Sequence, residues 1–64
     1  MKNVDLQRSD LEHADFTNAD LAGANLTGSK LVDAHFKKAN LTGANLNLAD
    51  TTDTDFSDAK GYNS

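Results

Sequence analysis

The sequence has no cysteine, no proline and no tryptophan. Without cysteine no disulfide can stabilise the fold, and the chain has no need of an oxidising compartment. Without proline there is also no segment that reads as a linker. A chain of 64 residues makes one domain at most, so we expect a single domain over residues 1–64.

Long apolar runs are also missing. No stretch approaches the ~18 residues of a membrane span, and no charged segment followed by an apolar one opens the chain as a signal peptide would. The net charge is −4, from ten acidic and six basic residues, whereas a general nucleic-acid binder would carry a basic stripe. We therefore expect a cytoplasmic protein with neither membrane nor direct nucleic-acid partners.

The residues of common catalytic sites are absent as well. No cysteine can act as a nucleophile, and no serine stands in a spacing that would bring histidine and a carboxylate to it. No glycine-rich, phosphate-binding loop appears, and a short repetitive chain has little room for a substrate cleft. We therefore expect no enzymatic activity and no cofactor.

What the chain does have is a five-residue repeat, clearest from Ala14 to Leu46. Each unit, or pentad, holds a small residue, a polar residue, a large apolar residue and two variable residues. The small residue is usually alanine, and Leu48 is the only leucine out of phase, so we expect it to point outward. Leucine or phenylalanine fills the large position, except at Thr51, and Met1 is in the same phase; we predict a core ladder of Leu6, Leu11, Phe16, Leu21, Leu26, Leu31, Phe36, Leu41, Leu46 and Phe56.

A period of five fits neither an α-helix nor a flat strand. Five residues of a helix rotate by about 500°, which would spread the leucines around its surface. In a flat strand, residues five apart point to opposite faces. The chain must therefore turn a corner in each pentad, and four corners close a square coil of 20 residues. Consistent with this coil, the three phenylalanines Phe16, Phe36 and Phe56 are spaced by 20, as in a solenoid.

These units resemble the pentapeptide-repeat family, whose pattern is A-(D/N)-L-x-x, over nearly the whole chain. The resemblance implies an all-β fold, a right-handed quadrilateral β-helix of about three coils. We place the repeats at about residues 2–62, with residues 60–64 as a tail. In the last coil Thr51 replaces leucine, Thr54 replaces alanine and Gly61 stands where a leucine belongs.

Two surface features are candidate sites. Stacking at a 20-residue interval brings His13 beside Asp33, and His35 between Asp15 and Asp55. Imidazole and carboxylate groups in such a cluster would suit Zn²⁺ or Ni²⁺, so His13, Asp15, Asp33 and His35 are candidate metal ligands. The alternative is that aspartate simply fills the polar position of the repeat and both histidines are solvated.

The second feature is an uncharged side of the coil. The segments 22–28 and 42–48 carry no charge and should stack on one another. We predict an interaction face there, formed by Gly23, Asn25, Gly43, Asn45 and Leu48. The open ends of the coil are liabilities as well, because each exposes unpaired backbone groups and bare apolar side chains. We therefore expect end-to-end or lateral self-association.

These observations favour a small structural or protein-interaction module. An alternative comes from the resemblance, because some pentapeptide-repeat proteins mimic duplex DNA and bind DNA gyrase or topoisomerase IV, which affects quinolone susceptibility. The acidic balance fits that alternative, but about 15 Å of solenoid matches less than half of a ~34 Å turn of B-DNA. The aspartates also alternate with lysine and asparagine, so they form no continuous row like that of DNA phosphates.

Overall fold

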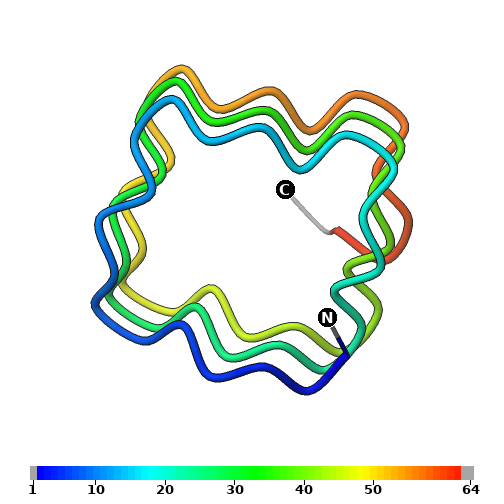
Figure 1. Ribbon diagram of the computed structural model, residues 1–64, viewed down its shortest axis with the longest axis horizontal. Helices are drawn as coiled ribbons and strands as arrows, with labels where there is room; N and C mark the ends of the chain where they lie inside the picture. Colours follow the sequence, from blue (N-terminus) through cyan, green and yellow to red (C-terminus); the bar gives the residue numbers. More distant parts are fainter. Residues whose placement is uncertain (1, 63–64) are drawn as a thin grey trace.

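The chain winds into a coil with a four-sided outline, and its successive turns lie over one another (Figure 1). The structure is a computed structural model that describes residues 2–62. Met1, and Asn63 and Ser64 of the expected tail, therefore lie outside the described residues. The coil is nearly as tall as it is wide, with extents of 21 × 20 × 19 Å. No helix in the described part is long and apolar enough to cross a membrane.

The register of the coil is uniform. Every backbone bridge between the described residues is parallel and joins residues 20 apart, from Asp5 with Asn25 to Asn40 with Lys60. We call residues 4–23 the first coil, 24–43 the middle coil and 44–62 the last coil. The bridges are isolated and fall at the polar position of each pentad. Residues 2–62 thus contain no continuous strand, because a turn follows each paired residue too soon for a second pair to form.

A tight turn supplies each corner. The N–H of a small residue donates to the carbonyl of the preceding large residue, as Ala24 does to Leu21 at 3.0 Å. The residue two places after each large residue from Leu6 to Phe56 has a φ between 56° and 72°. A type II turn requires such a left-handed residue at its third position. Glycine supplies that conformation without strain at Gly23, Gly28 and Gly43, but most pentads place a residue with a side chain there.

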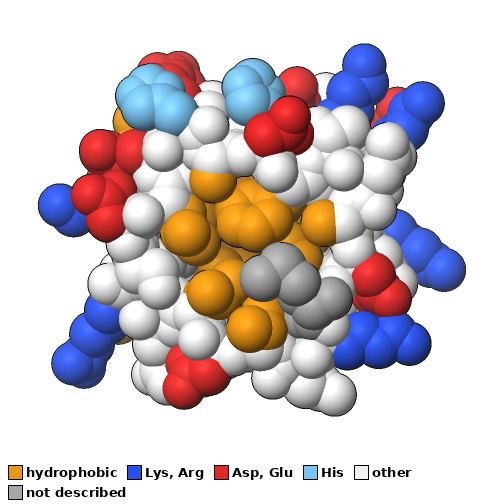
Figure 2. All heavy atoms as spheres, viewed as in Figure 1, with side chains coloured by type: hydrophobic (Ala, Val, Ile, Leu, Met, Phe, Trp, Pro, Cys, Tyr) orange, Lys and Arg blue, Asp and Glu red, His pale blue; other side chains and the backbone are white. Residues whose placement is uncertain are grey.

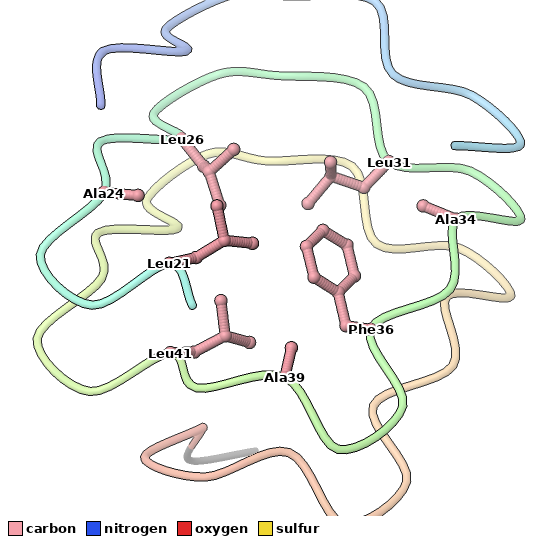
Figure 3. Close-up of a cluster of buried hydrophobic side chains, with 8 residues drawn as sticks. All are labelled: Leu21, Ala24, Leu26, Leu31, Ala34, Phe36, Ala39 and Leu41. Carbon is pink, nitrogen blue, oxygen red and sulfur yellow. The ribbon is translucent and has the colours of Figure 1, made fainter. Parts of the chain in front are cut away.

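The small and large residues of each pentad point inward, and the polar residue between them points out. Eight apolar side chains are at most 1% exposed and fill the centre of the coil, as Figure 3 shows. All ten residues of the predicted core ladder belong to this cluster or pack against it. The ring centroid of Phe36 lies 4.9 Å from that of Phe16 and 5.3 Å from that of Phe56, and the rings are stacked.

Two residues that replace alanine at the small position, Ser29 and Thr54, are accommodated by hydrogen bonds. The hydroxyl of Ser29, which is fully buried, donates to the carbonyl of Leu26 at 2.7 Å. The hydroxyl of Thr54 donates to the carbonyl of Leu31, also at 2.7 Å. Among the described residues, no buried side-chain polar atom is left without a partner. Burying these hydroxyl groups therefore carries little of the usual desolvation penalty.

Candidate interaction surfaces

The outward polar residue of the pentad has a structural task. Its side-chain oxygen accepts the backbone N–H of the residue two places on, as Asp15 does from Thr17 at 3.0 Å and Asn40 from Thr42 at 3.1 Å. That N–H begins the turn and has no partner in the neighbouring coil. Aspartate and asparagine suit this position because their short side chains accept hydrogen bonds from nearby backbone groups. Most of the surface carboxylates are thus accounted for by turns.

Three outward positions hold a basic residue, and these are Lys30, His35 and Lys60. A lysine has no acceptor at all, so Lys30 cannot accept the N–H of Val32 as an aspartate would. The backbone bridges place Lys30 between Asp10 and Asp50, and His35 between Asp15 and Asp55. In both columns a basic residue of the middle coil therefore lies between acidic residues of the outer coils.

The candidate metal ligands come together only in part. Nδ1 of His13 lies 3.8 Å from Oδ2 of Asp33, and both side chains are well exposed. His35 and Asp15 are neighbours in a separate column. No three histidine, aspartate or glutamate side chains within residues 2–62 are arranged to hold a metal ion. The geometry therefore does not support a metal site at His13, Asp15, Asp33 and His35.

At three surface aspartates, hydrogen bonds lower the pKa of the side chain more than nearby positive charges do. Bonds from the hydroxyl and the N–H of Thr17 lower the pKa of Asp15 below its ordinary value of 3.8, and nearby His35 adds a smaller effect. Thr52 lowers the pKa of Asp50 in the same way, with a smaller effect from Lys30. Ser57 does so for Asp55. These shifts are what turn-capping carboxylates show, and they do not indicate a catalytic group.

The predicted uncharged face is present as a surface. Asn25 pairs with Asn45 across the coils, and Gly23 lies beneath Gly43. Leu48 projects from the edge of this face with 89% of its surface exposed, as its phase predicts. Its φ of 62° also places a branched side chain in the left-handed region, which costs a non-glycine residue about 1–2 kcal/mol.

On one side the first coil has no neighbouring coil among the described residues, and we call this side its open edge. The N–H groups of Asp5, Asp10, Asp15 and Asp20 have no backbone partner among the described residues. Val4, Leu6, Leu11 and Phe16 are only half-buried and pack against the core. In Figure 2, viewed along the coil, hydrophobic side chains occupy the centre of the visible end and charged side chains lie around its rim.

The last coil ends differently, because the chain leaves the wall after Lys60. Lys60 still pairs with Asn40, and the next residues turn inward over the end of the coil (Figure 1). The ring of Tyr62 stacks on Phe56 at a centroid distance of 3.8 Å. Tyr62 therefore continues the phenylalanine column and covers part of this end, where the sequence predicted only a tail.

A Cβ built on Gly61 would lie 2.6 Å from Cα of Thr42. Only glycine can therefore follow this path, at a φ of 78°. Beside Tyr62 the end is hollowed by a cavity of about 480 Å³, lined by Leu41, Ala44, Asn45, Leu46, Asn47, Ala49, Thr51, Gly61 and Tyr62.

The comparisons with known proteins agree with this geometry. A family model described as pentapeptide repeats matches residues 1–37 and 29–60. The chain belongs to the pentapeptide-repeat family. Its coil is accordingly a right-handed β-helix, which is the handedness that the resemblance implied. No curated protein matches the sequence.

Among solved structures, the pentapeptide-repeat chain is similar to the pentapeptide repeat protein Rfr23 from the cyanobacterium Cyanothece 51142. The two are 33% identical over 86% of this chain, with a TM-score of 0.62. The match covers 41% of the Rfr23 chain, so this chain spans less than half the length of that relative. Pentapeptide-repeat proteins are generally non-enzymatic structural repeats, and no named partner follows from the match.

Two features of this pentapeptide-repeat chain escaped the sequence reasoning. The capping role of the outward aspartates and asparagines was hidden because their spacing also marks the repeat itself. Tyr62 was missed because it lies outside the five-residue phase. Its signal was nevertheless present, since it is the only tyrosine in the chain and follows a glycine that permits a reversal of direction.

Proposed function

We propose that this chain is a non-enzymatic protein-interaction module that docks β-structure onto the open edge of its first coil. The observation that carries the proposal is that Tyr62 stacks on Phe56 and covers part of the end of the last coil, whereas no described residue covers the end of the first coil in this way. The edge of the first coil presents N–H groups without described backbone partners above half-buried Leu6, Leu11 and Phe16. Edges of this kind accept a further strand through main-chain hydrogen bonds, with apolar contacts adding affinity.

Catalysis has little to support it. Outward aspartates are engaged in turns, and the cavity at the other end is lined by alanine, leucine, asparagine, threonine, glycine and tyrosine. That lining has no group suited to acid–base work near neutral pH. A rigid repeat that presents surfaces is the simpler account of the same residues.

No observation on the structure favours the gyrase-binding alternative. The coil measures 21 × 20 × 19 Å, so it lacks the elongated shape of a duplex that rises ~34 Å per turn. Its acidic columns are also interrupted by Lys30 and His35. Gyrase supercoiling that is inhibited by a stoichiometric amount of the protein would revive that alternative.

Self-association is one form that docking could take, and light scattering over a range of concentrations tests it. The edge-blocking variant is Asp10→Pro, because proline removes an N–H that no described residue accepts and places a ring at the edge. The matched control is Asp10→Asn, which keeps both that N–H and the oxygen that accepts from Glu12.

An increase in mass with concentration that Asp10→Pro abolishes and Asp10→Asn retains would identify a second copy as the docked partner. An equal increase in all three proteins would show that the edge of the first coil is not the docking surface. A constant monomer mass would remove self-association and leave a different protein as the partner.

A further inference from the structure

Hydrogen bonds between coils have a direction. In each pentad, two N–H groups of one coil donate to the following coil, as Leu11 does to Lys30 and His13 to Val32. Only one N–H donates the other way, as Lys30 does to Ser9. The edge of the first coil therefore offers two carbonyls for every N–H, and a last-coil edge offers the reverse. A partner that docks on the first coil must be rich in N–H donors, like the trailing edge of another β-coil.

Charge restricts the partner further. The outward polar positions of the pentads in the first coil are all acidic, and they are Asp5, Asp10, Asp15 and Asp20. Within the molecule, Lys30 of the middle coil pairs with Asp10, and His35 pairs with Asp15. At these two positions the chain gives up the turn hydrogen bond that aspartate or asparagine makes elsewhere. Opposite charges on neighbouring strands stabilise a pairing and like charges oppose it. The middle coil therefore indicates that basic residues are favourable neighbours for the edge of the first coil.

We propose that the edge of the first coil binds the donor-rich edge of another β-coil that carries basic residues over Asp10 and Asp15. This inference rests on the docking function proposed above and names the chemistry of the partner. The partner forms backbone hydrogen bonds along the edge, covers Leu6, Leu11 and Phe16, and places lysine or arginine where the middle coil has Lys30 and His35.

A second unaltered copy of this chain does not meet these requirements. Continuing the 20-residue register across a junction would set Asp50 of one copy beside Asp10 of the next, and Asp55 beside Asp15. Tyr62 also stacks on Phe56 at 3.8 Å, in the place that Phe16 of the next copy would take. Both features oppose head-to-tail growth, which would otherwise produce open filaments.

The test converts a copy of this chain into the required partner. The acidic probe carries Asp10→Pro, which blocks its own first-coil edge, and Gly61→Ala, which displaces Tyr62 because the added Cβ would collide with Thr42. The basic probe carries the same two changes together with Asp50→Lys and Asp55→Lys. Each probe is titrated into the unaltered protein, and complex formation is followed by calorimetry and light scattering.

We expect the basic probe to form a one-to-one complex with the unaltered protein and the acidic probe to bind about tenfold more weakly. Two exposed contacts that change from like to opposite charge have an effect of about that size. The preference should shrink at 1 M salt, where the screening length falls to about 3 Å. It should also disappear when the unaltered protein is replaced by Asp10→Asn/Asp15→Asn.

Equal binding of both probes would overturn the charge requirement while leaving the docking function in place. Failure of both probes to bind would overturn the inference together with the docking function. A basic probe that binds the Asp10→Pro variant as well as the unaltered protein would show that it docks elsewhere. Circular dichroism establishes that each probe is folded, and Tyr62→Ser is the second route to an uncovered end if Gly61→Ala fails to fold.

Discussion

The middle coil and the two outer coils are built from the same pentad, yet they differ in burial and in charge. Every fully buried residue except Leu21 belongs to residues 24–43. The equivalent side chains of the outer coils, such as Phe16 and Phe56, are half-buried. At the outward polar position of the pentad, the middle coil carries Lys30 and His35, whereas the first coil carries only aspartate. A repeat is therefore a core element where it has neighbours on both sides and a surface where it has one.

The largest expected effect compares phenylalanines of one column. Phe36→Ala removes a fully buried ring and should destabilise the protein by about 3–5 kcal/mol. Phe16→Ala removes a half-buried ring and should cost roughly half as much, because less apolar surface is lost from the interior. Urea denaturation measures both. Equal losses would show that the end of the first coil is covered as completely as the middle.

A second comparison concerns the corners. Gly43 has a φ of 72°, and a Cβ there would touch nothing closer than 3.9 Å, so Gly43→Ala tests backbone strain alone and should cost about 1 kcal/mol. Leu48 has a φ of 62° in the last coil, and asparagine tolerates that conformation better than leucine. Leu48→Asn should therefore stabilise the protein by roughly 0.5–1 kcal/mol. Thermal melts in which both changes act in the same direction would contradict this account.

Acid should destabilise the outer coils through their turn-capping aspartates. The folded pKa values of Asp15, Asp50 and Asp55 lie below the ordinary 3.8. The stability that they contribute is therefore complete above pH 3.8 and is lost as the pH falls through the lower folded values. Thr52→Val, which removes the hydroxyl that donates to Asp50, should reduce the pH dependence. An unchanged acid profile in that variant would locate the effect elsewhere.

The smallest expected effect tests why the middle coil is basic. Lys30→Asn supplies an acceptor for the N–H of Val32 but removes the positive charge between Asp10 and Asp50. The change in stability should stay within about 0.5 kcal/mol. It should be destabilising at low salt and stabilising in 1 M salt, where charge interactions are screened. Stabilisation at every salt concentration would mean that Lys30 contributes nothing through its charge.

Much of this architecture was predictable because one residue type recurs at one interval. The coil, the core ladder and the outward Leu48 follow from a period that neither a helix nor a flat strand can satisfy. The metal hypothesis gains no support from the structure, because neighbours within one column do not converge on a common point. His13 lies beside Asp33, but His35 lies in another column, and no third ligand joins the pair within residues 2–62.

The sequence alone determined the coil. Because a small, a polar and a large residue recur every five positions, a square solenoid is the packing that buries the large residues. Only the tertiary structure decided how the coil ends. Tyr62 reaches Phe56 because Gly61 passes close to Thr42, and no local pattern encodes that approach. The direction of the unpaired backbone groups at each edge likewise arises only when the coils are stacked, because hydrogen bonding between coils depends on what lies above and below each residue.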